Sequence, residues 1–128
     1  MSRLLVLVPV VVFLFAGISY AGGMQIIKKD GNYAYTITTD KNQPVTGENH
    51  IAIAITDESG APVKDAKVKI EYFMASMPAM NYKLNAGLDG DGYEARLDLP
   101  MAGRWKVKVN ASRGGRPLPV ARFSVDAH

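Results

Sequence analysis

Apolar and polar residues alternate one by one along most of the chain after residue 30. The same alternation recurs at residues 33–38, 51–55, 67–72, 93–99, 105–110 and 122–125. In residues 67–72, for example, Val68, Ile70 and Tyr72 are separated by lysine and glutamate. A period of two places successive side chains on opposite faces of a strand, whereas a helix repeats every 3.6 residues. The pattern therefore predicts antiparallel strands with one buried face and one solvated face.

Segments rich in glycine and aspartate separate these runs. Asp30-Gly31-Asn32, Asp89-Gly90-Asp91-Gly92 and Arg113-Gly114-Gly115-Arg116 have the composition of hairpin turns. No window has the period of an amphipathic helix. About seven short strands in roughly 100 residues predict an all-β fold, an immunoglobulin-like antiparallel β-sandwich. The chain has no cysteine, so we expect packing alone to hold this sandwich together.

The N-terminal residues have the composition of a secretory signal. Arg3 supplies a positive charge, residues 4–18 are apolar almost throughout, and Ser19-Tyr20-Ala21 places small residues before a cleavage site. A membrane-spanning helix needs about 20 apolar residues, so this run is short for one. We expect a signal peptide at residues 1–21, cut after Ala21, and one domain at residues 22–128 that is periplasmic or secreted. An uncleaved anchor in the cytoplasmic membrane is the less favoured alternative.

Composition argues against several classes of function. The 15 basic and 12 acidic side chains give a formal net charge of +3, which is too balanced for a nucleic-acid-binding domain. With no cysteine and only two histidines, a nucleophilic triad has few residues to draw on. A glycine-rich phosphate loop and a dinucleotide fingerprint are also absent from the sequence. We therefore expect a binding module that is not an enzyme and has no nucleic-acid partner.

The segment Met74-Ala75-Ser76-Met77-Pro78-Ala79-Met80 is the strongest candidate for a functional site. It carries three thioethers at a spacing of three around a proline. In a chain without cysteine, thioether sulfur is the only soft ligand, and soft ligands select Cu(I) among biological metals. Thioethers are neutral, so they bind the ion without losing a proton. The segment therefore predicts a site for Cu(I) or a similar soft metal.

Strand register makes the three methionines inequivalent. Met74 continues the inward row of residues 68–72 and is expected in the core. Pro78 has no backbone donor, so we expect the strand to end near it and to leave Met77 and Met80 in a loop at one pole. These two side chains could then bind metal or cap the core. The candidates for a third metal ligand are Met74, Met101 and His50.

Short motifs within residues 45–110 occur in a particular order and spacing. They are Pro62-Val63 with Ala66 and Val68, Met77-Pro78-Ala79-Met80, Gly92-Tyr93, Leu99, Met101-Ala102-Gly103, Trp105 and Val107. Together they resemble the YtkA-like domain family, to which the periplasmic part of FixH-type proteins is related. The resemblance implies an immunoglobulin-like module on the outer side of a bacterial cytoplasmic membrane, associated with heavy-metal efflux and copper handling. Relatives often carry a histidine shortly after the second methionine, where this chain has Asn81 and Tyr82.

Two hypotheses about function follow. In the first, the protein is a metal-handling accessory module that binds Cu(I) or a similar soft metal through Met77 and Met80 and passes it to a partner. In the second, the methionines and Pro78 form an apolar pole that packs internally or docks a membrane-bound efflux or oxidase-assembly partner, with no metal of its own. Under either hypothesis, Trp105 at the head of an inward row is expected to be the main core aromatic residue.

Overall fold

The computed structural model describes residues 23–128, so the expected signal peptide at residues 1–21 lies outside the described residues. The described chain is all strand and loop, and it contains no helix that could cross a membrane. Its strands are β1 (Gln25–Asp30), β2 (Tyr33–Thr39), β3 (Gly47–Thr56), β4 (Ala66–Met74), β5 (Met77–Asp89), β6 (Gly92–Leu99), β7 (Gly103–Arg113), β8 (Arg116–Pro117) and β9 (Ala121–Ala127). The prediction of an all-β fold is confirmed.

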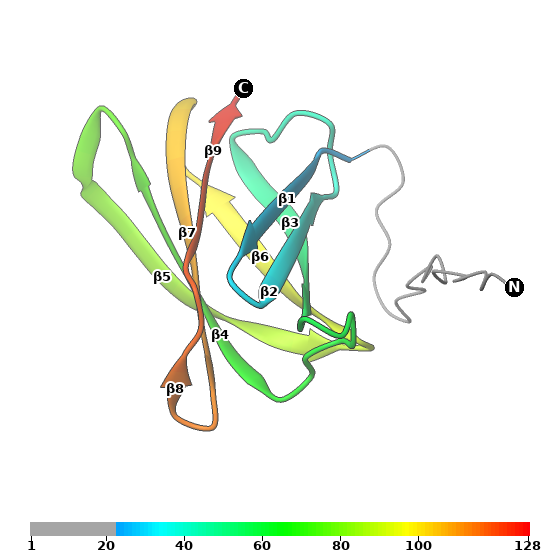
Figure 1. Ribbon diagram of the computed structural model, residues 1–128. Helices are drawn as coiled ribbons and strands as arrows, with labels where there is room; N and C mark the ends of the chain where they lie inside the picture. Colours follow the sequence, from blue (N-terminus) through cyan, green and yellow to red (C-terminus); the bar gives the residue numbers. More distant parts are fainter. Residues whose placement is uncertain (1–22) are drawn as a thin grey trace, which may run out of the picture.

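The strands form two antiparallel layers that face each other (Figure 1). The first sheet has the order β1-β2-β3-β6, and the second contains β4 between β5 and β7, with β8 and β9 also paired to β7. β5 joins the two layers, because residues 81–86 pair with β4 whereas residues 87–89 pair with β6. The predicted antiparallel β-sandwich is thus observed in a nearly barrel-like form, with one continuous strand order running through both sheets.

The core lies between the two layers and is filled by the apolar members of the alternating runs. β3 contributes Ile51, Ile53 and Ile55, each of which is almost completely buried. Their counterparts in the second sheet include Ile70, Val107 and Val109, together with Trp105, which is fully buried as predicted. The largest fully buried side chains also include Tyr35, Ile37, Val63 and Leu99. The period of two in the sequence therefore defines which side of each strand faces the core.

One buried polar side chain shapes the loop between β2 and β3. The Asn49 side-chain oxygen accepts a hydrogen bond from the Val45 amide at 2.8 Å. Its nitrogen donates to the carbonyl oxygens of Val45 at 2.8 Å, Gly47 at 3.1 Å and Leu97 at 3.4 Å. Buried backbone polar groups need hydrogen-bond partners. The Asn49 side-chain amide supplies them to backbone groups of the β2–β3 loop that do not pair with another strand.

Candidate metal site at one pole of the sandwich

The Met74–Met80 segment forms the tip of a tight hairpin. β4 ends at Met74 and β5 begins at Met77, so only Ala75 and Ser76 make the turn. The Ala75 amide donates to the Arg104 carbonyl at 2.9 Å, which fastens the turn to the start of β7. The tip stands at the end of the sandwich where β7 begins and β9 ends (Figure 1).

Pro78 lies inside β5, so the prediction that the strand ends near this residue is wrong. Met74 pairs with Met77 and Phe73 pairs with Asn81, and residues 78–80 therefore oppose no residue of β4. In such a bulge a residue need not donate to the ladder, and this is one of the few places where a sheet tolerates proline. Met77 and Met80 consequently belong to a strand rather than to a loop.

The turn between β6 and β7 brings Met101 to the same pole. The Met101 carbonyl accepts a hydrogen bond of 3.0 Å from the indole nitrogen of Trp105. Gly103 lies so close to Met74 that a Cβ at this position would be 2.6 Å from the methionine methyl carbon. Met74 and Met77 are direct cross-strand partners, so their side chains project from the same face. The structure thus brings Met74, which pairs with Trp105 on β7, and the backbone of the turn that carries Met101 to one end of the sandwich. We call Met74, Met77, Met80 and Met101 the methionine pole.

The members of the methionine pole differ in their access to solvent. Met77 is 39% exposed and Met101 is 41% exposed, whereas Met74 is only 5% exposed, as its register predicts. Met80 is half-buried and packs against the core. A soft ion that approaches from solvent would therefore reach Met77 and Met101 more readily than the buried Met74.

Aromatic rings support this pole from within the second sheet. The rings of Tyr72 and Tyr82 are stacked with their centroids 5.4 Å apart. The Trp105 ring lies 5.9 Å from Tyr72 and 6.1 Å from Tyr82. Tyr82, which occupies the stretch where relatives often carry a histidine, thus covers the buried indole and is itself 38% exposed. The sequence indicated a core tryptophan but gave no sign of this three-ring cluster.

The structure does not bring His50 to the methionine pole. His50 is on β3 and pairs with Arg96 on β6, in the first sheet, and its side chain lies outside the core. Its Nε2 is 2.6 Å from a Glu48 carboxylate oxygen, and its Nδ1 is 3.1 Å from a Glu94 oxygen. Both ring nitrogens therefore already contact carboxylates, so His50 does not provide a third metal ligand beside the thioethers.

The contacts of His50 give a pH-dependent prediction. Hydrogen bonds to Glu94 and then to Glu48 raise its pKa above the ordinary value. Its ion pairs should stabilise the fold fully below the pKa of the unfolded chain, about 6.5, and this contribution should be lost as the pH rises through the higher folded pKa. In an NMR titration, Glu94→Gln should lower the His50 midpoint, whereas Glu58→Gln, a change on an exposed turn, should not. Equal midpoints in the wild type and Glu94→Gln would contradict this assignment.

Oxygen and nitrogen ligands offer no competing metal site in the described part of the chain. Within residues 23–128, no group of three or more histidine and acidic side chains is arranged so that it could hold a metal ion. Thioether sulfur is the type of side-chain ligand that the methionine pole offers. Such ligands favour soft ions over calcium or magnesium, which prefer oxygen.

The fold and the methionine pole define a small antiparallel β-sandwich module. The chain matches the YtkA-like family over residues 27–110, which is well over half of its length. The protein therefore belongs to the YtkA-like family, as the resemblance in its sequence predicted. The match begins within β1 and includes β2, and both strands precede the motifs that indicated the family. No curated protein shows significant similarity to the chain.

Proposed function

We propose that this protein is an exported, non-enzymatic accessory module that binds Cu(I), or a similar soft ion, at the methionine pole. The observation that carries the proposal is that two separate turns bring Met74, Met77 and Met101 to one end of the sandwich, where Met74 pairs with Met77 on β5 and with Trp105 on β7. The signal-like composition of residues 1–21 supports export, and an oxidising compartment suits thioethers because they form no disulfides.

The division of the methionine pole into exposed and buried thioethers suits transfer of an ion. Met77 and Met101 are partly exposed to solvent, whereas Met74 is buried in the core. Cu(I) accepts a small number of soft ligands without a rigid geometry, so an incomplete set on the protein leaves room for a ligand from a partner. The pole would therefore hold the ion while one side stays open for its release to a membrane-bound efflux or oxidase-assembly partner.

A Cu(I) titration under reducing conditions, with a chromogenic chelator as competitor, tests the proposal. The double variant Met77→Leu/Met101→Leu should bind Cu(I) at least about tenfold more weakly, a loss of about 1.4 kcal/mol in binding free energy. Leucine keeps most of the apolar volume, so the fold should persist. Met24→Leu is the matched control, because it removes a thioether next to β1 and leaves the pole intact. Equal Cu(I) affinity in the double variant and the wild type would refute the proposal.

One observation favours a second function for the same pole. The exposed large apolar side chains of residues 23–128 are Ile27, Met77, Tyr82, Leu88 and Met101. Three of these lie on the β4–β5 hairpin and the β6–β7 turn, so they form an exposed apolar surface that could dock a partner without metal. In that case the double variant would lose its partner in co-purification from membranes while its Cu(I) affinity stayed that of the wild type.

A further inference from the structure

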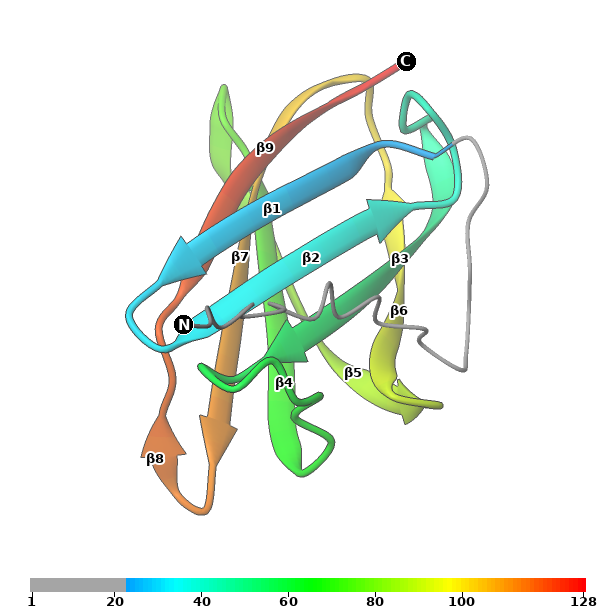
Figure 2. The same ribbon diagram turned by 45° about the vertical axis from the view of Figure 1, so that its right-hand side comes forward.

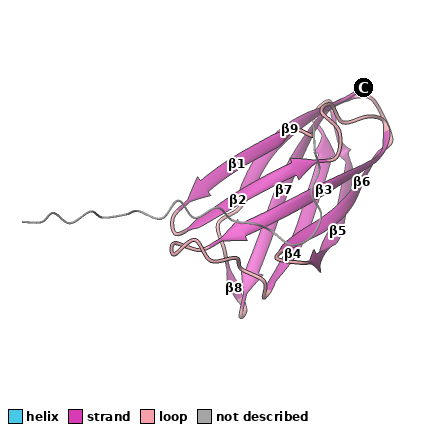
Figure 3. Ribbon diagram, turned by 90° about the vertical axis from the view of Figure 1, so that its right-hand side faces the viewer, coloured by secondary structure: helices cyan, strands magenta, loops and turns pink. Residues whose placement is uncertain are grey.

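Two edge strands, β1 of the first sheet and β9 of the second, lie beside each other without pairing. β1 pairs only with β2, and β9 pairs only with β7. Figures 2 and 3 show the two strands side by side, and in Figure 2 they run in opposite directions. Each strand therefore presents one row of backbone N–H and C=O groups that no other described strand uses. Such unpaired edges are templates for pairing with another chain.

Hydrogen bonds tie both ends of β9 to the first sheet, through β2 at one end and through the loop between β2 and β3 at the other. At one end the Tyr35 hydroxyl donates to the Pro119 carbonyl at 2.6 Å, just before β9 begins. At the other end the His128 amide donates to the Pro44 carbonyl at 3.1 Å, and the Thr46 amide donates to the His128 carbonyl at 2.9 Å. The open stretch is thus the length of β9, or seven residues. At 3.3–3.4 Å per residue this is roughly 23 Å, enough for one further strand.

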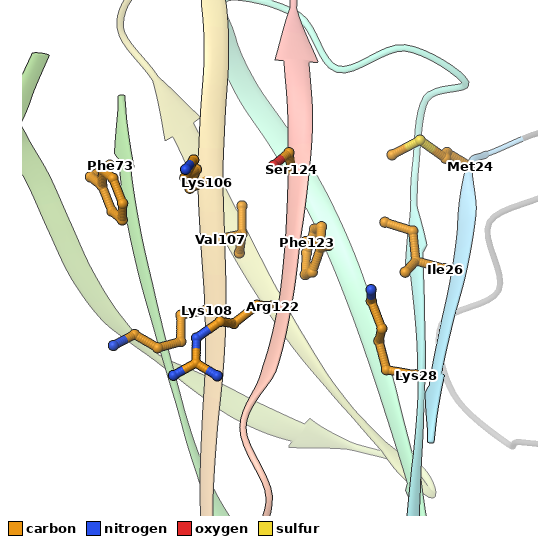
Figure 4. Close-up of a pocket in the computed structure, with 10 residues that line it drawn as sticks. All are labelled: Met24, Ile26, Lys28, Phe73, Lys106, Val107, Lys108, Arg122, Phe123 and Ser124. Atoms are coloured by element: carbon orange, nitrogen blue, oxygen red, sulfur yellow. The ribbon is translucent and has the colours of Figure 1, made fainter. Parts of the chain in front are cut away.

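A groove of about 820 Å³ follows this opening (Figure 4). Its apolar part is formed by Met24 and Ile26 beside β2, and by Val107 and Phe123 of the second sheet. Its charged lining is formed by Lys28, Lys106, Lys108 and Arg122. All four charged residues in the lining are cations, so the groove combines an apolar surface with a row of positive side chains.

Lys28 is an unusual residue for its position. It pairs with Tyr35, and its neighbour in the same row, Ile26, pairs with Ile37. Tyr35 and Ile37 are both almost completely buried, so Lys28 lies on the inward-facing side of β1. It is nevertheless exposed, because nothing covers the groove there. An inward-pointing lysine on an edge strand is a device that opposes pairing with a second copy of the same edge.

The cations of the second sheet are also short of partners. Lys108 and Arg122 are direct cross-strand neighbours, an arrangement in which like charges repel. Lys108 approaches Glu71 only to 3.9 Å. Within residues 23–128, Lys28, Lys106 and Arg122 take part in no ion pair. The folded domain therefore keeps an uncompensated positive charge along the groove.

We propose that an extended, acidic segment of a partner protein adds to the sandwich between β1 and β9. Its backbone would pair with the free strand edges, which gives a register but no sequence preference. Because its side chains alternate, apolar residues would lie on Phe123 and Val107 while acidic residues face Arg122, Lys106 and Lys108. The same cations repel a second copy of this edge, so the partner is a different chain. This surface is separate from the methionine pole and does not depend on metal binding.

The experiment measures binding of a defined peptide to protein made from the full-length chain. The probe is a fluorescent ten-residue peptide of alternating valine and glutamate, compared by anisotropy with a peptide of alternating valine and lysine. At physiological salt the Debye length is about 8 Å, so distant charges contribute little. We expect the acidic peptide to bind and the basic peptide not to. Hydrogen exchange should then show new protection of the β9 amides that face away from β7.

Charge-reversal variants locate the binding surface. Lys106→Glu/Arg122→Glu should weaken binding of the acidic peptide by at least about tenfold, because both cations lie on the outward face that the acidic side chains meet. The matched control is Arg96→Glu, since this exposed arginine lies on β6 in the other sheet and should leave the affinity unchanged. Thermal unfolding of each variant checks that the fold persists.

Three results would overturn the proposal. The first is equal binding of the acidic and basic peptides. The second is binding without new protection of β9 amides, which would show adsorption to a charged surface. The third is binding of phosphatidylglycerol vesicles, lost in Lys106→Glu/Arg122→Glu, while the acidic peptide does not bind, which would assign the groove to an anionic membrane.

Discussion

Replacing Trp105 with alanine should lower the free energy of unfolding by about 3–5 kcal/mol, the usual cost of removing a large buried aromatic side chain. The indole is fully buried and lies about 6 Å, between ring centroids, from both Tyr72 and Tyr82. Its nitrogen also holds the Met101 carbonyl, so the turn between β6 and β7 would lose its anchor. Native domains are stable by about 5–15 kcal/mol, so this variant should be marginal. Urea denaturation followed by circular dichroism measures the loss.

Trp105→Phe separates the two parts of this effect. Phenylalanine keeps much of the apolar contact area but cannot donate to the Met101 carbonyl, so a smaller loss is expected. The packing argument would fail if Trp105→Ala destabilised the domain by less than about 1 kcal/mol, the range of an ordinary substitution.

Replacing Asn49 with alanine should cost about 2–3 kcal/mol of stability, since unsatisfied buried polar groups cost roughly 1–3 kcal/mol. The side chain is 2% exposed and makes hydrogen bonds to both backbone groups of Val45 and to the carbonyls of Gly47 and Leu97. Alanine would remove all of these bonds while the surrounding chain stays buried. Chemical denaturation of the two proteins under the same conditions gives the difference.

Two further substitutions make this test specific. Asn49→Asp keeps an oxygen for the Val45 amide but no longer donates, and it places a charge in the core, so it should be at least as destabilising as alanine. Asn85→Ala changes an exposed asparagine on β5 and should alter stability by no more than about 0.5 kcal/mol. If Asn49→Ala and Asn85→Ala proved equally stable, the buried amide would have no special role in the β2–β3 loop.

The alternating pattern predicted most of the strands, because a strand with one buried and one solvated face needs apolar and polar residues in alternation. It was insufficient for β1 and β5. β1 is an edge strand whose residues are mostly exposed, so no clear apolar row marks it. β5 is exposed along most of its length and changes partner from β4 to β6, and a strand that serves two sheets need not alternate strictly. Turn composition alone located the hairpin that follows each of these strands, at residues 30–32 and 89–92.

The candidate metal site was predictable in part. The register of β4 placed Met74 in the core, and the softness of sulfur singled out the methionines as ligands. The bulge that keeps Pro78 within β5 depends on how β4 and β5 pair, which the local sequence does not determine. The close approach of Gly103 to Met74, which brings the turn that carries Met101 to the β4–β5 hairpin, depends on β7 lying next to β4, a contact between segments distant in the chain. The groove between β1 and β9 likewise exists only once the two sheets are stacked.

The change of partner along β5 has a consequence for how a ligand would act on the domain. The strand begins at the methionine pole, crosses from the second sheet and ends paired to the first. The two sheets therefore cannot separate unless β5 releases one of its partners, and the domain should open as a single cooperative unit. An ion bound at the start of β5 would stabilise this whole unit by mass action, rather than only the hairpin that holds it. Occupancy of a small surface site would thus raise the free energy of unfolding of the entire sandwich.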